Sequence, residues 1–353
     1  MEAGEETRDV PPVVWRTGLR STEPHLLVLG QPGAGTTTLL RSIALQALPY
    51  GDVLVIDGSG TGEYACLAGR TGVMGVESGL SGALATLEWA AHETERRLIT
   101  ANRARQAGRQ APDDIRWPLW IILDRPSALA HLSVAEGRDD PQQLLHVPLR
   151  HGRAAYVTVV VADQLDSAGL LSEPVLTHTR ARVVLGPATP EDVQAVLGAP
   201  PHTTPAADVP PGRGYARLGN GPVLRLQVPA TPDPYDDATS EAHRQAVLDL
   251  LPEPAAAMEE DATEDLSAAA VLARAEGTGG TDGAVEGGAV PGGAVPGGAV
   301  PGAEGGTVAG GAVGVDVLFG GAGLAAPSAP EEITEPSGPA PAHRTVDAGR
   351  AEG

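Results

Sequence analysis

A glycine-rich stretch between an apolar run and a helical pattern constrains the fold of this chain most strongly. In VLGQPGAGTTTLLRS (28–42), Gly30 and Gly35 have the spacing of the phosphate-binding loop G-x-x-x-x-G-K-[ST], and Thr37 fills its hydroxyl position. Such a loop binds phosphate through backbone N–H groups and the N-terminus of the next helix. The lysine position, however, holds Thr36. The sequence therefore predicts a nucleotide-binding loop without its usual cation, formed by Gly30, Gln31, Pro32, Gly33, Ala34, Gly35, Thr36, Thr37 and Thr38.

The residues around this loop alternate between strand and helix patterns. Continuous apolar runs, typical of strands buried on both faces of a parallel sheet, occur at 25–30, 52–57, 118–124, 156–163 and 181–186. Helices are expected at 37–48, 80–106 and 189–198, and an antiparallel pair around an Asn-Gly turn at 214–228. This alternation predicts an α/β fold in which helices flank a mainly parallel sheet.

The longest helical pattern, 80–106, has one apolar face. Its small and apolar residues recur at steps of three and four, and we expect them to pack in the core: Leu80, Leu84, Leu87, Ala91, Thr94, Leu98 and Ala101. The pattern at 189–198 opens with Thr189 and Asp192, which predicts a capped helix start.

Composition restricts the class of protein. The 353 residues include no lysine, so all 24 basic residues are arginines, against 45 acidic residues. The single cysteine, Cys66, excludes an intramolecular disulfide and fits a reducing compartment. The sequence contains neither a signal-peptide pattern nor a run of 18 apolar residues, and its nine histidines have no metal-ligand spacing. We therefore expect a cytoplasmic chain with no membrane span and no zinc.

The last hundred residues differ in composition from the rest. Residues 251–353 hold 3 arginines against 16 acidic residues, and 287–301 repeat GGAVP three times. Such a segment buries too little apolar surface to offset its ordering entropy, so we expect an acidic, mostly disordered tail. Within it, a short helix at 263–276 and an apolar docking segment at 315–327 are alternatives to plain disorder. The expected domains are an N-terminal extension (1–22), a P-loop domain (23–232) and the tail (233–353).

Several segments, in the same order, resemble the FtsK/SpoIIIE-type P-loop ATPases, which include type VII secretion ATPases. They are PHLLVLGQPGAGTTTLL (24–40), the helix at 83–108, LWIILDR (119–125), GRAAYVTVVVADQ (152–164) and PGRGYARL (211–218). The resemblance covers about residues 11–230. It implies a RecA-like P-loop NTPase fold that binds ATP or ADP with Mg²⁺.

The resemblance also assigns roles to single residues. Thr37 and Asp124 would hold Mg²⁺, and Gln164 matches the family's sensor glutamine. Arg125 stands where the family places the glutamate that polarises the attacking water, and an arginine cannot accept a proton. The loss of the loop lysine implies roughly ten- to hundredfold weaker triphosphate binding. Arg41 is an alternative cation, although helix geometry directs it away from the loop.

Arg180 and Arg182 lie where family members place interface or phosphate-sensing arginines, and a plain surface role is the alternative.

Three functions follow from these observations. We expect a nucleotide-binding protein that is a weak or inactive ATPase and acts as a partner or regulatory subunit, with a protein partner or as a homo-oligomer. An active DNA or protein translocase is the first alternative, but residues 1–250 carry a net charge of −8, which does not favour DNA binding. A ligand-free scaffold of the same fold is the second.

Overall fold

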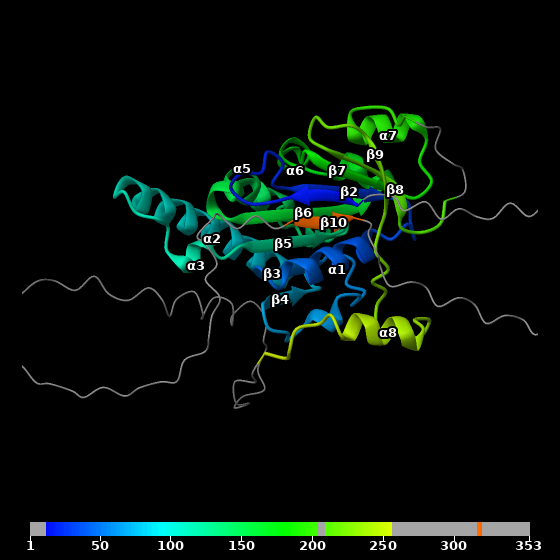
Figure 1. Cartoon of the computed structure of the whole chain (residues 1–353), viewed down its shortest axis with the longest axis horizontal. Coiled ribbons are helices and arrows are strands. Elements are labelled where there is room, and N and C mark those ends of the chain that lie inside the picture. Colours follow the sequence, from blue (N-terminus) through cyan, green and yellow to red (C-terminus); the bar gives the residue numbers. More distant parts are fainter. Residues whose placement is uncertain (1–11, 203–208, 256–315, 320–353) are drawn as a thin grey trace, which may run out of the picture.

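A computed structural model describes residues 12–202, 209–255 and 316–319. Its main sheet has eight strands in the order β4-β3-β5-β6-β2-β7-β8-β9 (Figure 1). They are β2 (Leu26–Gly30), β3 (Asp52–Asp57), β4 (Val73–Glu77), β5 (Leu119–Asp124), β6 (Val157–Gln164), β7 (Ala181–Leu185), β8 (Arg213–Leu218) and β9 (Leu224–Gln227). The first six strands in this spatial order are parallel to one another. Strands β8 and β9 extend the sheet beyond β7, and each runs antiparallel to its neighbour. The predicted α/β fold with a mainly parallel sheet is confirmed.

Side chains alternate between the two faces of this sheet because successive residues of a strand point to opposite sides. On one face, Leu26 and Val28 of β2 join the core beneath α1 (Thr36–Ala47). On the other, Leu27 and Leu29 join the core beneath a larger set of helices. That set comprises α2 (Leu80–Gln106), α4 (Pro126–Ala135), α5 (His146–Ala155), α6 (Glu173–His178) and α7 (Pro190–Leu197).

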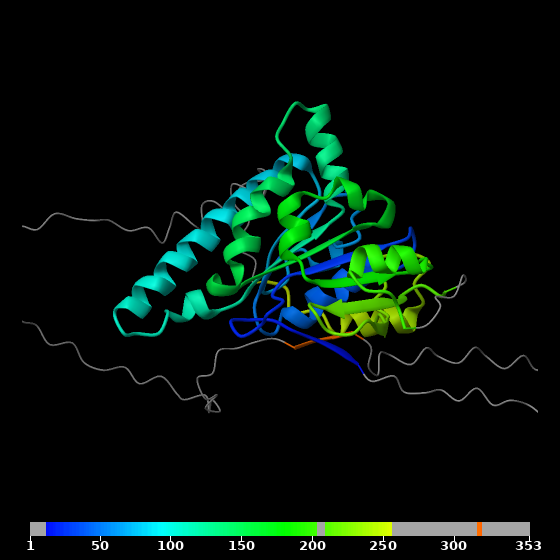
Figure 2. The ribbon, with the colours of Figure 1, turned by 90° about the horizontal axis from the view of Figure 1, so that it is seen from above.

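The expected helices are present, with one difference in packing. Helix α2 spans Leu80–Gln106 as predicted, and both views show it reaching beyond the sheet towards α3 (Asp113–Arg116) (Figures 1 and 2). Its buried face is turned slightly from the expected one: Ala83, Ala90 and Arg97 are buried, whereas Leu84 and Leu98 are half-buried. Arg97 is accommodated because it donates to Glu93 Oε1 and to Trp117 O. The capping box of Thr189 and Asp192 at α7 is confirmed.

Three short 3₁₀ helices complete the connections: η1 (Ala65–Leu67), η2 (Pro141–Leu145) and η3 (Leu165–Leu170).

Both ends of the chain contribute elements to the same side of the body. Strand β1 (Val13–Arg16) pairs antiparallel with β10 (Asp316–Phe319), so part of the expected docking segment at 315–327 does dock. Helix α8 (Glu241–Leu248), inside the range assigned to the tail, buries Val247 in the core beneath α1. The helix expected at 263–276 and most of the expected disorder lie outside the described residues, and the domain boundaries stay a prediction.

Candidate nucleotide site

The loop between β2 and α1 has a backbone that only glycine adopts freely at two positions. Gly33 has φ +75° and Gly35, which precedes α1, has φ +94°, both in the left-handed region. A Cβ on Gly30 would lie 2.7 Å from Thr36 Cγ2, so the strand and the helix approach closely there. The segment before β8 supports the loop, because Gly212 N–H donates to Ala34 O at 2.8 Å. These contacts hold the loop in an open turn at the start of α1.

This turn leaves a group of backbone donors without partners. Gln31 N–H donates to Leu185 O and Ala34 N–H donates to Gln31 O. Within the residues that the structure describes, no partner is present for the N–H groups of Gly33, Gly35, Thr36, Thr37 and Thr38. These residues are half-buried or exposed, and the groups lie at the N-terminus of a helix. Such an arrangement binds an anion such as a phosphate.

Asp124 lies at the end of β5 and meets the loop through Thr37. Its Oδ2 accepts from Thr37 Oγ1 at 2.7 Å and from the hydroxyl of Tyr64 at 2.8 Å. The register aligns Asp124 with Asp57 of β3 and Gly30 with Gln164 of β6, so all four residues end neighbouring strands at one edge of the sheet. In parallel α/β sheets, ligands bind at this edge, beyond the carboxyl ends of the strands.

The same carboxylate has a buried oxygen with no partner. Asp124 is 2% exposed, and within the described structure its Oδ1 makes no hydrogen bond. Burial raises the pKa of Asp124 to about 6, although the hydrogen bonds from Thr37 and Tyr64 lower it. The carboxylate is therefore mainly ionised near neutral pH. Mg²⁺ usually takes one or two protein carboxylates besides water and phosphate oxygens. The free oxygen of Asp124 can supply this carboxylate, and the Thr37 hydroxyl can supply a further oxygen.

Tyr64, which precedes η1, was not expected at this site. It is fully buried, and burial together with the neighbouring Asp124 raises the pKa of its hydroxyl well above the usual range. Tyr64 therefore acts as a neutral donor to Asp124. It lies in the segment EYACL, which has no periodic pattern, so its contact with a strand 60 residues away could not be predicted from the sequence.

Arg41 lies behind Tyr64 and is fully occupied with other partners. Its guanidinium carbon is 5.9 Å from the centre of the Tyr64 ring. It donates to Glu63 O from Nε and Nη2, and to Thr231 O from Nη1 at 2.8 Å. Arg41 therefore does not replace the missing loop lysine, in agreement with the direction expected from helix geometry.

Arg125 and Gln164 bind each other. When the amide oxygen of Gln164 faces the guanidinium of Arg125, that oxygen accepts from both Nη1 and Nη2 at 3.1 Å. Arg125 has a left-handed backbone (φ 54°, ψ 57°), rare for a residue with a side chain, and its N–H donates to Ala162 O. The residue in the expected position of a general base is thus a cation, and it holds the expected sensor glutamine.

Two further buried carboxylates support the loops around the site. Asp57 accepts from the N–H groups of Ser59, Gly60 and Gly62 and from the Ser59 hydroxyl. Asp163, beside Gln164, accepts from the N–H and hydroxyl of Ser127 at the start of α4. Both carboxylates therefore stabilise turns at the rim of the site.

Arg180 and Arg182 lie away from this edge. They flank Ala181, the first residue of β7, which aligns with Leu26 at the beginning of β2, whereas the loop follows the end of that strand. Arg182 donates to the carbonyl groups of Leu176, Thr179 and Val196. Arg180 is exposed and donates to Asn220. Neither arginine therefore lies near a phosphate bound at the loop of its own chain, and the interface role stays a prediction.

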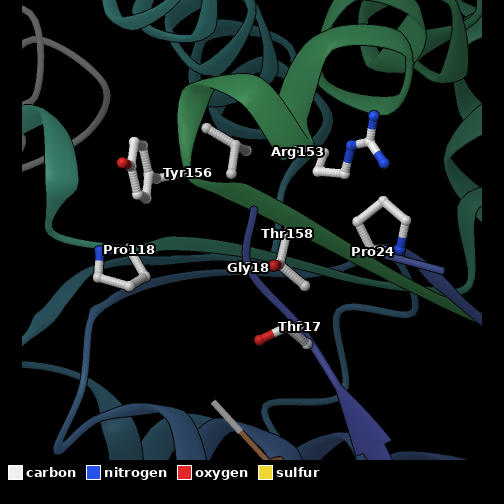
Figure 3. A pocket seen from close by; sticks show the side chains of 8 residues that line it. Thr17, Gly18, Pro24, Pro118, Arg153, Tyr156 and Thr158 are labelled. Atoms are coloured by element: carbon white, nitrogen blue, oxygen red, sulfur yellow. The ribbon is translucent and has the colours of Figure 1, made fainter. Parts of the chain in front are cut away.

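A small hollow lies at the opposite edge of the sheet (Figure 3). Thr17, Gly18 and Pro24 line it from the chain before β2, and Pro118 and Thr158 from the beginnings of β5 and β6. Its volume of about 10 Å³ is near the lower limit for one water molecule. It offers no room for a nucleotide.

The strand order and the loop define a P-loop ATPase fold: a mainly parallel sheet, a glycine loop leading into a helix, and a carboxylate at the end of a nearby strand. No protein-family model and no curated protein sequence matches the chain. Solved structures similar to it include ATPase domains and a conjugation coupling protein. One is the cytoplasmic domain of the type VII secretion ATPase EccC from Thermomonospora curvata, at 22% identity and TM-score 0.47 over 67% of this chain and 30% of that one.

Two others have comparable values. The pCW3 conjugation coupling protein TcpA, solved as a monomer with ATPγS, is 18% identical at TM-score 0.46, over 61% of this chain and 65% of that one. EssC (ATPases 2 and 3) from Geobacillus thermodenitrificans is 13% identical at TM-score 0.46, over 64% and 42%. This chain thus spans less than two thirds of each. The fold assignment rests on the strands and the loop described above.

Two further properties of the described residues bear on the site. None of their helices is long and apolar enough to span a membrane. Among the same residues, no group of three or more His, Cys, Asp or Glu side chains could hold a metal ion. A cation at Asp124 would therefore depend on phosphate oxygens and water for most of its ligands.

Proposed function

We propose that this chain binds ATP or ADP with Mg²⁺ at the loop 30–38 and hydrolyses ATP weakly or not at all, acting as a partner or regulatory subunit. The observation that carries the proposal is the set of free backbone donors at the start of α1 beside the unpartnered oxygen of Asp124. Binding of phosphate needs these donors, whereas hydrolysis needs a cation and a base that the chain has replaced.

The loop N–H groups would bind the phosphates, and Thr37 and Asp124 would hold Mg²⁺, which neutralises phosphate charge when bound. Tyr64 and Thr37 orient the Asp124 carboxylate by donating to the same oxygen. Thr36 offers only a neutral hydroxyl where a lysine would contact the terminal phosphates.

Hydrolysis lacks a second component. Arg125 cannot accept the proton of an attacking water, and its guanidinium is engaged with Gln164. Phosphoryl transfer depends almost entirely on positioning and electrostatic stabilisation, so both replacements slow the same step. The cytoplasmic location, a protein partner and assembly into a homo-oligomer stay predictions.

Calorimetry of the full chain with Mg·ATP and Mg·ADP tests the proposal. We expect the two affinities to agree within about tenfold, because the backbone donors contact the phosphates that both ligands share. Chelation of Mg²⁺ and, separately, the Asp124→Ala variant should weaken both. The absence of binding at millimolar nucleotide would favour the ligand-free scaffold, and steady phosphate release lost in Asp124→Ala would favour the active translocase.

A further inference from the structure

Strands β1 and β10 form a small sheet of their own, separate from the eight-stranded one. They are antiparallel, with Val13 opposite Phe319 and Arg16 opposite Asp316, and they lie side by side along the edge of the body in Figure 2. Sixty residues, 256–315, separate β10 from the last described residue of the body. A chain of that length can span up to about 200 Å, so the connection does not force β10 into this place.

The inner face of β10 is anchored by one side chain. Val317 is fully buried and lies opposite Trp15 in the register. Trp15 in turn meets Trp120 of β5 edge to face, with the ring centres 5.9 Å apart. Val317 therefore belongs to the core beneath α1, opposite Trp15 of β1.

The outer edge of β10 is bound through its backbone. Leu318 N–H donates to Gln46 Oε1 at 2.9 Å, and Gln46 Nε2 donates to Leu318 O at 3.3 Å. Gln46 belongs to the last turn of α1, the helix that begins at the glycine loop. Strand β10 is therefore bound on one edge by the backbone of β1 and on the other by the amide of Gln46. An extended peptide can be bound in this way mainly through its main chain.

The remaining contacts of β10 are weak. The ion pair between Arg16 and Asp316 joins two side chains that are 77% and 54% exposed, and such pairs stabilise little. The side chain of Leu318 is exposed. A two-stranded sheet of four-residue strands is at best marginally stable by itself, so β10 keeps its place mainly through the buried Val317 and the two hydrogen bonds to Gln46. Docking of β10 is therefore reversible on these contacts.

We propose that β1 and the C-terminal end of α1 form a peptide-binding site, and that residues 316–319 are its built-in ligand. The site selects an extended segment with one small apolar side chain, which occupies the place of Val317. Trp15 closes the inner side of the site and Gln46 binds the backbone on the outer side. The site opens when the segment leaves, and an added peptide of the same sequence then takes its place.

The test uses the full chain and a dye-labelled peptide with the sequence of residues 312–322, followed by fluorescence anisotropy. Val317→Asp places a charge in the buried position, which should weaken docking of the chain's own segment by roughly ten- to hundredfold. The labelled peptide should therefore bind the Val317→Asp chain at least about tenfold more tightly than the wild-type chain, in which the built-in segment competes.

Leu318→Asp is the matched control, because it adds the same charge on the same strand at an exposed position; it should bind the peptide as weakly as the wild-type chain. Adding Gln46→Ala to Val317→Asp should reduce peptide binding, and a peptide carrying Val317→Asp should bind no variant. Thermal unfolding establishes that each variant is folded. Equal binding to wild type and Val317→Asp, or no binding to a folded Val317→Asp chain, would overturn the proposal.

Discussion

The buried carboxylate of Asp124 lowers the stability of the protein in the absence of Mg²⁺ and nucleotide. Burial raises its pKa from 3.8 to about 6. A raised pKa in an acid means that the folded state prefers the protonated form, so this contribution to stability is present below pH 3.8 and is lost as the pH rises through about 6. The loss amounts to about 3 kcal/mol at pH 7.5, which lies above both pKa values, and to about half of that at pH 5, which lies between them.

The change to test is Asp124→Asn, which keeps the shape and an acceptor for Thr37 and Tyr64 but removes the charge. Relative to wild type, the variant should gain about 1.5 kcal/mol more at pH 7.5 than at pH 5. For a domain of this size, the difference in Tm between variant and wild type should then grow by about 3–6 °C between the two pH values. The assay is thermal unfolding in the presence of a chelator at both pH values.

Asp57→Asn is the matched control, because Asp57 ends the neighbouring strand but accepts from four donors. We expect it to lower Tm at both pH values, since charge-assisted hydrogen bonds are lost. A Tm difference for Asp124→Asn that is the same at pH 5 and pH 7.5 would refute the reasoning that an uncompensated buried charge lies at this site.

Two further predictions concern the loop and the chemistry. Gly35→Val should abolish nucleotide binding, measured by calorimetry, because its left-handed φ of +94° excludes a branched side chain. Gly137→Val, at φ +65° in the segment that follows α4, should bind normally, and the idea fails if both variants bind. Only the double variant Thr36→Lys with Arg125→Glu should release phosphate measurably, since general-base assistance is worth about 10²–10⁴ in rate and acts only when phosphate charge is also offset. Activity in either single variant, or wild-type turnover of about 1 s⁻¹ that Asp124→Ala removes, would contradict this.

The parts of the fold that depend on local pattern could be predicted from the sequence. The buried strands are continuous apolar runs, and the glycine loop has a fixed spacing, so Gly30, Thr37 and Asp124 are found where they were expected. The partners of these residues could not be predicted. Tyr64 reaches Asp124 from an irregular loop, and the interaction of Arg125 with Gln164 joins the ends of two strands.

The register of the strands and the pairing of segments far apart in the chain also could not be predicted from the sequence. Arg180 and Arg182 could be placed near a strand, but only the alignment of β7 with β2 shows that they lie at the wrong end of it. The segment at 315–327 could be named as apolar, yet its partner β1 has only four residues and no distinctive pattern.

The pairing of β1 with β10 has a mechanical consequence. Residues 1–12 continue from Val13 and residues 320–353 continue from Phe319, and these two residues lie opposite each other at one end of the pair. Tension applied between the chain ends would separate the strands sequentially from that end, one residue pair after another, instead of loading all of them in shear. The pair would open at low force, and only afterwards would the pull reach β2 and the nucleotide loop. The β1–β10 pair would thus separate before the eight-stranded sheet and the loop 30–38 are deformed.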